Sequence, residues 1–498
     1  MSPLSRQMMR RWAELGPRFL PFADAASETL PLSRLLRLSL FQVSVGMALA
    51  LLVGALNRVL IVELGVSAGL VALMVALPVL YAPVRAFIGF KSDHHRSALG
   101  WKRVPYIWMG TMLQFGGLAM MPFALLVLAG QGDSANWPGW LGPAGAAVAF
   151  LLMGAGVHTV QTAGLALATD LAPVEDHPKV VGFMYVMLLV GTILSAFAFG
   201  AVLAEFTPGR LVQVIQGCAL VTLVLNTIAL WRQESIGRSR LRDPTPEPDF
   251  RLAWRTYVAI DGTPQRLLAI GLGTMGFAMQ DVLLEPYGAQ VLGMSVGQTT
   301  WLTAAFATGG LIGFTLASRL LTRGWPSALG GRGHALDAAS MAMLGASLGA
   351  PAFAAVLVAA LTLSVPLFVA GVVLIGFGGG LFAHGMLTVT MNSAPREHAG
   401  LALGVWGAVQ ATAAGVAVAC GGLLRDAVIA WGPGVIEASA WRAPASGYAF
   451  VYAIEIVLLI ATAWVMWPLV GTRTRANGGA AFARGTPSST SPLPETPR

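Results

Sequence analysis

Two histidines within apolar runs, His158 and His384, have side chains that could hold a metal ion. Each has a glycine four residues earlier, Gly154 and Gly380, in the sequences GAGVH and GLFAH. Residues four apart lie on one face of a helix, so each glycine would leave a flat space beside an imidazole. A neutral imidazole facing such a space can ligate the central ion of a tetrapyrrole. The alternative is a hydrogen-bonded histidine with a structural role, because glycine is frequent throughout this chain.

A second set of polar residues lies inside two other apolar runs. The first run carries Asn57 and Arg58, and the seventh carries Gln280, Asp281 and Glu285. Asp281 and Glu285 are four residues apart and share a helix face. Ionisable groups at membrane depth are costly and usually functional, so we expect Arg58 to pair with Asp281 or Glu285. The sequence leaves open whether this pair only locks two helices together or takes part in proton coupling.

The elements that position these residues are membrane-spanning helices. Hydrophobic residues make up 56% of the 498 residues, charged residues only 11%, and the mean hydropathy is +0.70. A soluble domain needs more surface charge, so the surplus apolar surface must face lipid. A bilayer core takes about 20 apolar residues per helix, which predicts an all-α membrane protein with twelve transmembrane helices. The predicted spans lie near residues 38–63, 68–90, 103–129, 141–169, 180–203, 211–232, 267–292, 298–322, 336–362, 365–393, 399–423 and 448–470.

The placement of basic residues predicts the orientation. Of 31 lysines and arginines, only Arg210, Arg425 and Arg442 fall in loops opposite the N-terminus, while Arg58 and Arg85 fall within spans. By the positive-inside rule both termini are cytoplasmic. The net charge of +8 is then a consequence of topology, and no nucleic-acid partner is expected.

The chain divides into five segments. A cytoplasmic or interfacial arm is followed by a six-helix half, a Pro-rich basic linker, a second six-helix half and a tail rich in Gly, Ser, Thr and Pro. We expect the linker to be cytoplasmic and the tail to be disordered and cytoplasmic. The segments are residues 1–37, 38–232, 233–266, 267–470 and 471–498.

Two pairs of short sequences repeat across the linker. ELGVSAG at 63–69 resembles VLGMSVG at 291–297, and ATDLAP at 168–173 resembles TMNSAP at 390–395. Because each half has an even number of spans, the halves are predicted to be parallel repeats, the arrangement of the major facilitator fold. Asp170 and Asn392, within the second pair, are expected to cap and break their helices.

The loop after the second span resembles the facilitator loop motif, in which a glycine, an aspartate and later basic residues clamp one side of the membrane. Gly89, Asp93, Gly100, Lys102 and Arg103 fit its residue types. Six residues separate the aspartate from the second glycine, more than the usual motif has. The corresponding stretch of the second half lacks the aspartate. The clamp is therefore altered, and alternating access is not assumed.

Long stretches of the chain resemble the PucC/LhaA family, the bacteriochlorophyll delivery branch of the facilitators. The similarity runs from about residue 20 to 470. The sequences that carry it are LPLSRLLRLSLFQVSVGMA (30–48), LNRVLIVELGV (56–66), FIGFKSDHHRSALGWKRVPYIWMG (87–110), HTVQTAGLALATD (158–170) and MQDVLLEPYGAQVLGMSVGQTTWLTA (279–304). Residues 170–191 favour the LhaA-like side, which is associated with LH1.

The resemblance implies an assembly factor for light-harvesting complexes, LH1 or LH2, that binds bacteriochlorophyll and delivers it to antenna α and β polypeptides. It implies as partners LH1–reaction-centre or LH2 assembly intermediates and pigment-synthesis enzymes, within the bacterial cytoplasmic or intracytoplasmic photosynthetic membrane. Antenna polypeptides hold the pigment through a small residue four before a histidine, which adds weight to His158 and His384 as ligands. Apart from the pigment magnesium, no metal is expected.

One alternative is a secondary transporter of a small solute with a proton-coupled central cavity, using Arg58, Asp281 and Glu285. A solute carrier usually has several charges at mid-membrane, and this chain has few, which favours the assembly role. An enzyme is not expected, because the sequence has no nucleotide-binding loop, paired-histidine metal motif or nucleophile–base constellation.

Overall fold

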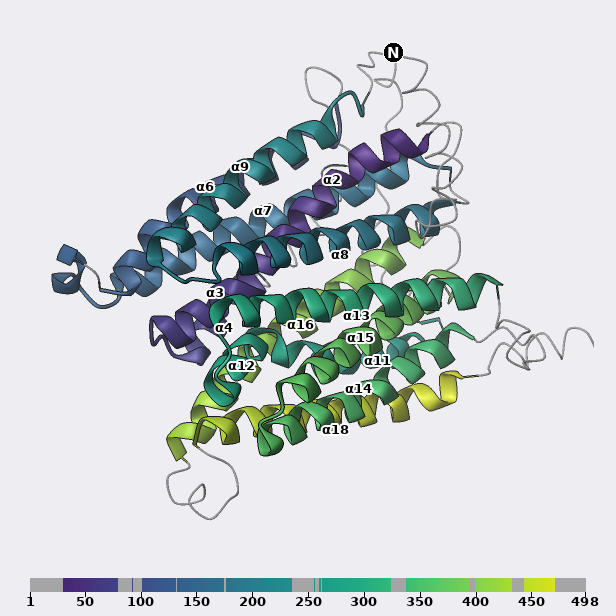
Figure 1. Cartoon of the computed structure of the whole chain (residues 1–498). Coiled ribbons are helices and arrows are strands. Elements are labelled where there is room, and N and C mark those ends of the chain that lie inside the picture. The colour runs from purple at the N-terminus through teal and green to yellow at the C-terminus, as the bar shows by residue number, and fades with distance from the viewer. Residues whose placement is uncertain are drawn as a thin grey trace, which may run out of the picture.

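The protein consists of two helical bundles that lie against each other along α8 (His177–Val202) and α13 (Val296–Arg323) (Figure 1). The computed structural model describes residues 30–78, 92, 101–130, 132–173, 176–234, 255, 259–260, 262–323, 337–393, 399–431 and 443–470. Within these ranges the regular structure is helical throughout.

The first bundle holds the predicted first half, and the second bundle holds the predicted second half. Besides α8, the first contains α2 (Leu32–Leu49), the π-helix η2 (Ala50–Ala55), α3 (Leu56–Arg58), the π-helix η3 (Val59–Glu63), α4 (Ala68–Ala76), α6 (Val104–Leu128), η5 (Gly132–Asn136), α7 (Leu141–Leu171) and α9 (Pro208–Leu230). Besides α13, the second contains α11 (Thr263–Ala278), the 3₁₀ turn η7 (Met279–Val282), α12 (Leu284–Leu292), α14 (Ala338–Thr362), α15 (Val365–Ser393), α16 (Ala399–Trp431), α18 (Ala443–Met466) and η10 (Trp467–Leu469).

The helices agree with the predicted spans. In the described part of the chain, ten are long and apolar enough to cross a membrane, and α11 with α12 forms a bent eleventh. The predicted second span begins as α4, and its continuation beyond Pro78 lies outside the described residues. Three boundaries differ by five residues or more. The first and last spans, predicted from residues 38 and 448, start at Leu32 and Ala443. The span predicted at 399–423 runs on to Trp431, so Arg425 lies within a helix and not in a loop.

The two halves repeat the same local geometry 228 residues apart. Gly65 and Gly293 both have positive φ, +64° and +68°, a conformation that favours glycine. Two residues later, the hydroxyls of Ser67 and Ser295 accept hydrogen bonds from backbone N–H groups three residues further on. The same glycine turn and serine cap thus start the second span of each half, which supports the parallel repeat.

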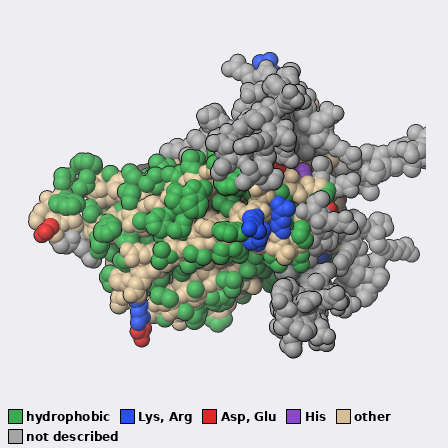
Figure 2. All heavy atoms as spheres, turned by 90° about the horizontal axis from the view of Figure 1, so that it is seen from above, with side chains coloured by type: hydrophobic (Ala, Val, Ile, Leu, Met, Phe, Trp, Pro, Cys, Tyr) green, Lys and Arg blue, Asp and Glu red, His purple; other side chains and the backbone are tan. Residues whose placement is uncertain are grey.

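The outer surface of the bundles is apolar. Figure 2 shows hydrophobic side chains over most of the described face, with charged groups toward its ends. Phe123, Trp464 and Trp467 are more than 60% exposed, which water would not favour. This belt is the surface expected of a protein surrounded by lipid, and the chain is an integral membrane protein.

We call the end at which α9 finishes and α11 begins the linker end, and the opposite end the distal end. At the distal end the halves make close contact. Gly200 of α8 and Gly297 of α13 bring two backbones together, since a Cβ atom at Gly297 would lie 2.8 Å from the carbonyl oxygen of Gly200. Nearby, the backbone N–H of Gly69 in α4 donates to Asp426 of α16 (2.6 Å). A carboxylate at a helix N-terminus is stabilising. The hydrogen bond from Gly69 to Asp426 therefore holds the two halves together.

Candidate functional site

Spans one and seven are both interrupted near the middle of the molecule. In span one the α-helix gives way to the π-helix η2, and in span seven η7 separates α11 from α12 with a bend of 48°. Pro286 lies in the first turn of α12, where its missing N–H leaves no hydrogen bond unmade. The two breaks occupy corresponding positions of the repeat. Interrupted helices at a repeat interface are a common setting for binding sites in membrane proteins.

A cavity of about 190 Å³ lies between the halves at these breaks. Its polar wall includes Gln280, Asp281 and Glu285, which the sequence singled out, together with Thr192 and Thr303. The Thr303 hydroxyl donates to Glu285 Oε1 (2.6 Å), and the Gln280 amide donates to Asp281 Oδ1 (2.8 Å). The cavity's other wall is apolar. It is formed by Leu49, Val53, Leu188, Leu189, Leu284, Phe306 and Ala307.

Glu455 of α18 belongs to this polar region, although it was not among the residues predicted for the site. Its side chain is fully buried, and Oε1 accepts the backbone N–H of Gln280 in η7 (2.8 Å). The signal available in the sequence was a single glutamate within the apolar run of the last span. An acid in such a position is usually functional or paired.

Arg58 forms an ion pair, as predicted, but the predicted partner was wrong. The guanidinium of Arg58 binds Glu63, at the other end of η3, and not Asp281 or Glu285. The predicted meeting of spans one and seven does occur one residue earlier, where the Asn57 amide donates to the backbone carbonyl of Asp281 (3.4 Å). Arg58 is 5% exposed and lies within electrostatic range of Glu285.

The glycines before the two histidines do not leave open space, which corrects their predicted role. A Cβ atom at Gly154 would lie 2.1 Å from the ring of Pro78, and one at Gly380 would lie 2.3 Å from the carbonyl oxygen of Gly310. Both glycines therefore serve close helix packing.

The histidines themselves stand apart from the cavity, since neither belongs to its lining. His384 is 8% exposed, and its ring meets that of Phe314 edge-to-face at 4.5 Å. His384 is thus largely enclosed by protein, and pigment ligation by His384 stays a prediction. His158 is only partly buried, so pigment ligation by His158 stays a prediction.

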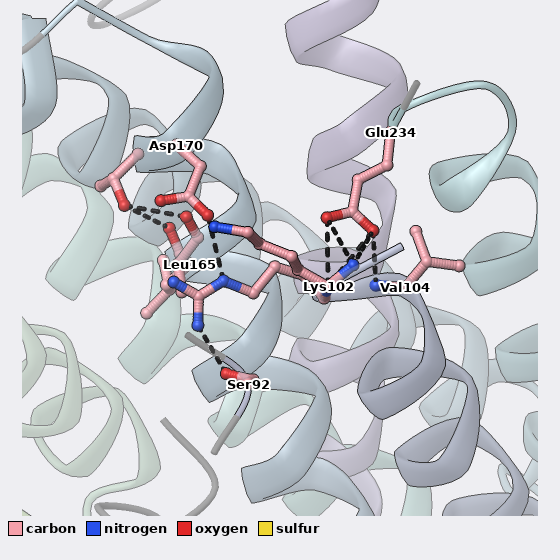
Figure 3. Close-up of polar contacts among 9 residues, drawn as sticks. Ser92, Lys102, Val104, Leu165, Asp170 and Glu234 are labelled. Atoms are coloured by element: carbon pink, nitrogen blue, oxygen red, sulfur yellow. Dashed lines mark hydrogen bonds and ion pairs between the residues drawn. The ribbon is translucent and has the colours of Figure 1, made fainter. Parts of the chain in front are cut away.

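The basic end of the loop motif ties several elements together at the linker end (Figure 3). Arg103 donates to Ser92 Oγ (2.5 Å) and to Asp170 Oδ2 (3.1 Å), and Glu234 accepts the backbone N–H groups of Lys102 and Arg103 at 3.1–3.2 Å. Asp170, expected to be a helix cap, thus pairs with the loop arginine across helices. Three residues predicted for the motif lie outside the described residues: Gly89, Asp93 and Gly100.

Comparison with known proteins agrees with this geometry. The model of the family described as PUCC protein matches residues 55–474. The chain belongs to the PucC family. Protein PucC of Rhodovulum sulfidophilum is 59% identical over 86% of this chain and 92% of its own length. Protein PucC of Cereibacter sphaeroides is 53% identical over 94% of this chain and 98% of its own length.

A third relative, from Rhodobacter capsulatus, is described as an uncharacterized protein in the puhA–bchM intergenic region. It is 51% identical over 94% of each chain. The identities to the three relatives are similar, at 59%, 53% and 51%, so they do not distinguish the branches of the family. Membership of the LhaA-like branch stays a prediction.

Solved structures show that the PucC-family chain has the major facilitator fold predicted from sequence. A D-xylose–proton symporter matches 88% of this chain and 97% of its own with a TM-score of 0.63 at 16% identity. A bacterial homologue of the iron transporter ferroportin, in an inward-facing state, matches 87% and 97% with a TM-score of 0.62 at 14% identity. These similarities concern the fold alone.

Proposed function

We propose that this chain is an assembly factor for light-harvesting complexes, LH1 or LH2, that carries bacteriochlorophyll to antenna α and β polypeptides. The observation that carries the proposal is the family match over 55–474. The proposal includes no reaction catalysed by the chain itself.

The proposed setting follows from the same role. The partners are antenna polypeptides, LH1–reaction-centre or LH2 assembly intermediates, and enzymes of pigment synthesis. The location is the cytoplasmic membrane and its intracytoplasmic photosynthetic extensions, with both termini cytoplasmic. The exposed apolar belt, with Phe123, Trp464 and Trp467 among its largest side chains, offers lipid-embedded partners a surface for packing.

The cavity between the halves is too small for the pigment. Its 190 Å³ falls below the roughly 300–1,000 Å³ of pockets that enclose a drug-sized ligand, and a tetrapyrrole with its long tail is larger than such ligands. We therefore place the pigment on the outer face of the protein.

A groove on the lipid-facing side of α6 and α7 suits an apolar, flat cargo. It has a volume of about 720 Å³ and is lined mainly by apolar side chains, among them Met120, Phe123 and Trp137. Asp133 and Ser134 of η5 are the polar side chains of its lining. A carboxylate oxygen is a suitable ligand for a magnesium ion, so Asp133 could hold the pigment's metal while the tail packs in the groove.

A test of this placement is to fill the groove. Gly145 lines it, and a Cβ atom there would touch only Ala124, at 3.8 Å, so Gly145→Trp should fold. We expect at least a fivefold lower ratio of bacteriochlorophyll to purified protein than in the wild type, read from the absorption spectrum. Gly217→Trp on α9, where a Cβ atom would meet nothing within 4 Å, is the control. An unchanged ratio in Gly145→Trp would show that the pigment binds elsewhere on the protein. The ratio of pigment to protein would then be measured for His158→Ala.

The alternative function, proton-coupled transport of a small solute, is favoured by one observation. Asp281 and Glu285 both face the cavity at the interrupted helices. In the assembly role the pigment binds on the outer surface, so that role assigns no function to this cavity.

A further inference from the structure

The cavity between the halves has more hydrogen-bond acceptors than donors. Gln280 Oε1 and Glu285 Oε2 are buried oxygen atoms without a hydrogen-bond partner among the described residues. Their side chains are 1% and 2% exposed, and both residues line the cavity. A buried acceptor left unsatisfied costs about 1–3 kcal/mol. The two atoms therefore indicate an occupant that donates hydrogen bonds.

The same region also gathers three carboxyl groups. Asp281 and Glu285 line the cavity, and Glu455 lies directly behind it, on the backbone of Gln280. Arg58, which lies within electrostatic range of Glu285, is engaged by Glu63. A buried carboxylate must either take up a proton or find a cation. The occupant is therefore expected to be positively charged when these acids are ionised.

The geometry of the acids disfavours a bound metal ion. The described residues contain no group of three His, Cys, Asp or Glu side chains arranged to hold one. The two acids of the wall are already engaged on one side, by the Thr303 hydroxyl and by the Gln280 amide. The two buried acceptors without a partner, Glu285 Oε2 and Gln280 Oε1, suit a donor that makes directed hydrogen bonds.

The opposite wall sets the shape of the occupant. Leu49, Val53, Leu188, Leu189 and Phe306 make it apolar. A water molecule takes about 30 Å³, so 190 Å³ holds a molecule of several heavy atoms. An apolar wall that faces acceptors fits a molecule with a charged head and a short hydrocarbon tail.

We propose that this cavity binds a small primary alkylammonium ion. An ammonium group has three N–H donors and carries a positive charge. It would donate to Glu285 Oε2 and Gln280 Oε1 and neutralise the carboxylate of Asp281. Its alkyl chain would pack against Leu188 and Phe306. Binding of one ammonium ion displaces one proton from the pair of carboxyl groups, so that its single positive charge is balanced by one carboxylate. This inference is independent of the pigment-carrying role.

The test uses the purified full-length protein in detergent, titrated with n-butylammonium chloride. We expect a saturable rise in melting temperature and the release of about one proton per protein, followed with a pH dye in weak buffer. Butan-1-ol, which has the same tail without the charge, should produce neither effect. Potassium chloride at equal ionic strength controls for general salt effects.

Two variants assign the site. Glu285→Gln should weaken n-butylammonium binding at least tenfold. Glu205→Gln, which makes the same change at an exposed ion pair with Arg210, should bind like the wild type. The proposal is overturned if the wild type responds alike to n-butylammonium and butan-1-ol, if potassium gives the same response, or if folded Glu285→Gln binds normally. Should Glu285→Gln fail to fold, the wild-type comparison of ammonium with alcohol decides alone.

Discussion

Replacing Gly380 with alanine is expected to destabilise the protein severely, by about 3 kcal/mol or more, with or without pigment present. A Cβ atom there would lie 2.3 Å from the carbonyl oxygen of Gly310 and 2.8 Å from the backbone nitrogen of Phe314. Both atoms belong to the backbone of α13, so no side-chain rotation relieves the clash and the two helices must separate. Thermal unfolding and the yield of monodisperse protein measure the effect.

Gly217→Ala is the matched control, because a Cβ atom at that position meets nothing within 4 Å. It should leave the melting temperature within a few degrees of the wild type. If Gly380→Ala were as stable as the wild type and lost bound pigment, Gly380 would be making space for pigment, as its spacing before His384 first suggested. Loss of stability alone would establish Gly380 as a packing residue.

Replacing Glu455 with alanine should have the second large effect, a loss of about 2–4 kcal/mol. The change leaves the backbone N–H of Gln280 without its acceptor at the break in span seven, and it opens a cavity in a fully buried position. Glu455→Gln keeps an acceptor oxygen and nearly the same volume, so it should cost about 1 kcal/mol or less. Unfolding of the three proteins in detergent compares them. Equal damage from alanine and glutamine would show that the charge of Glu455 matters, and not its hydrogen bond.

The sequence was sufficient to predict the fold because its signals are strong and redundant. Apolar runs of spanning length and the repeat of residues 63–69 at 291–297 both agree with two parallel bundles. It also predicted that spans one and seven meet at their polar residues, since such residues are costly in lipid. Asn57 and Asp281 are in contact there.

The partner of Arg58 could not be predicted with α-helical spacing. Glu63 is five residues away, and an α-helix brings residues three or four apart together. The π-helix η3 changes this register, because its hydrogen bonds join residues five apart. α-Helical spacing therefore points to a partner on another helix, although the acid lies on the same one.

The histidine motif was misread for a different physical reason. A glycine four residues before a histidine leaves a flat helix face, and the sequence does not say what fills it. At Gly154 the ring of Pro78 fills the space, and at Gly380 the backbone of α13 does. Glu455 was overlooked because a single acid in an apolar run has no spacing pattern, and its partner is a backbone N–H exposed by a helix break.

The most direct test of the pigment-carrying role is a transfer measurement. The protein, purified with bacteriochlorophyll bound, is mixed with pigment-free antenna α and β polypeptides in detergent, and the absorption spectrum is followed over time. The account predicts that the band of the carried pigment declines as the red-shifted band of assembled antenna grows, faster than from free pigment at the same concentration. If the protein binds no pigment, or if bound pigment enters antenna no faster than free pigment does, the carrier role is wrong.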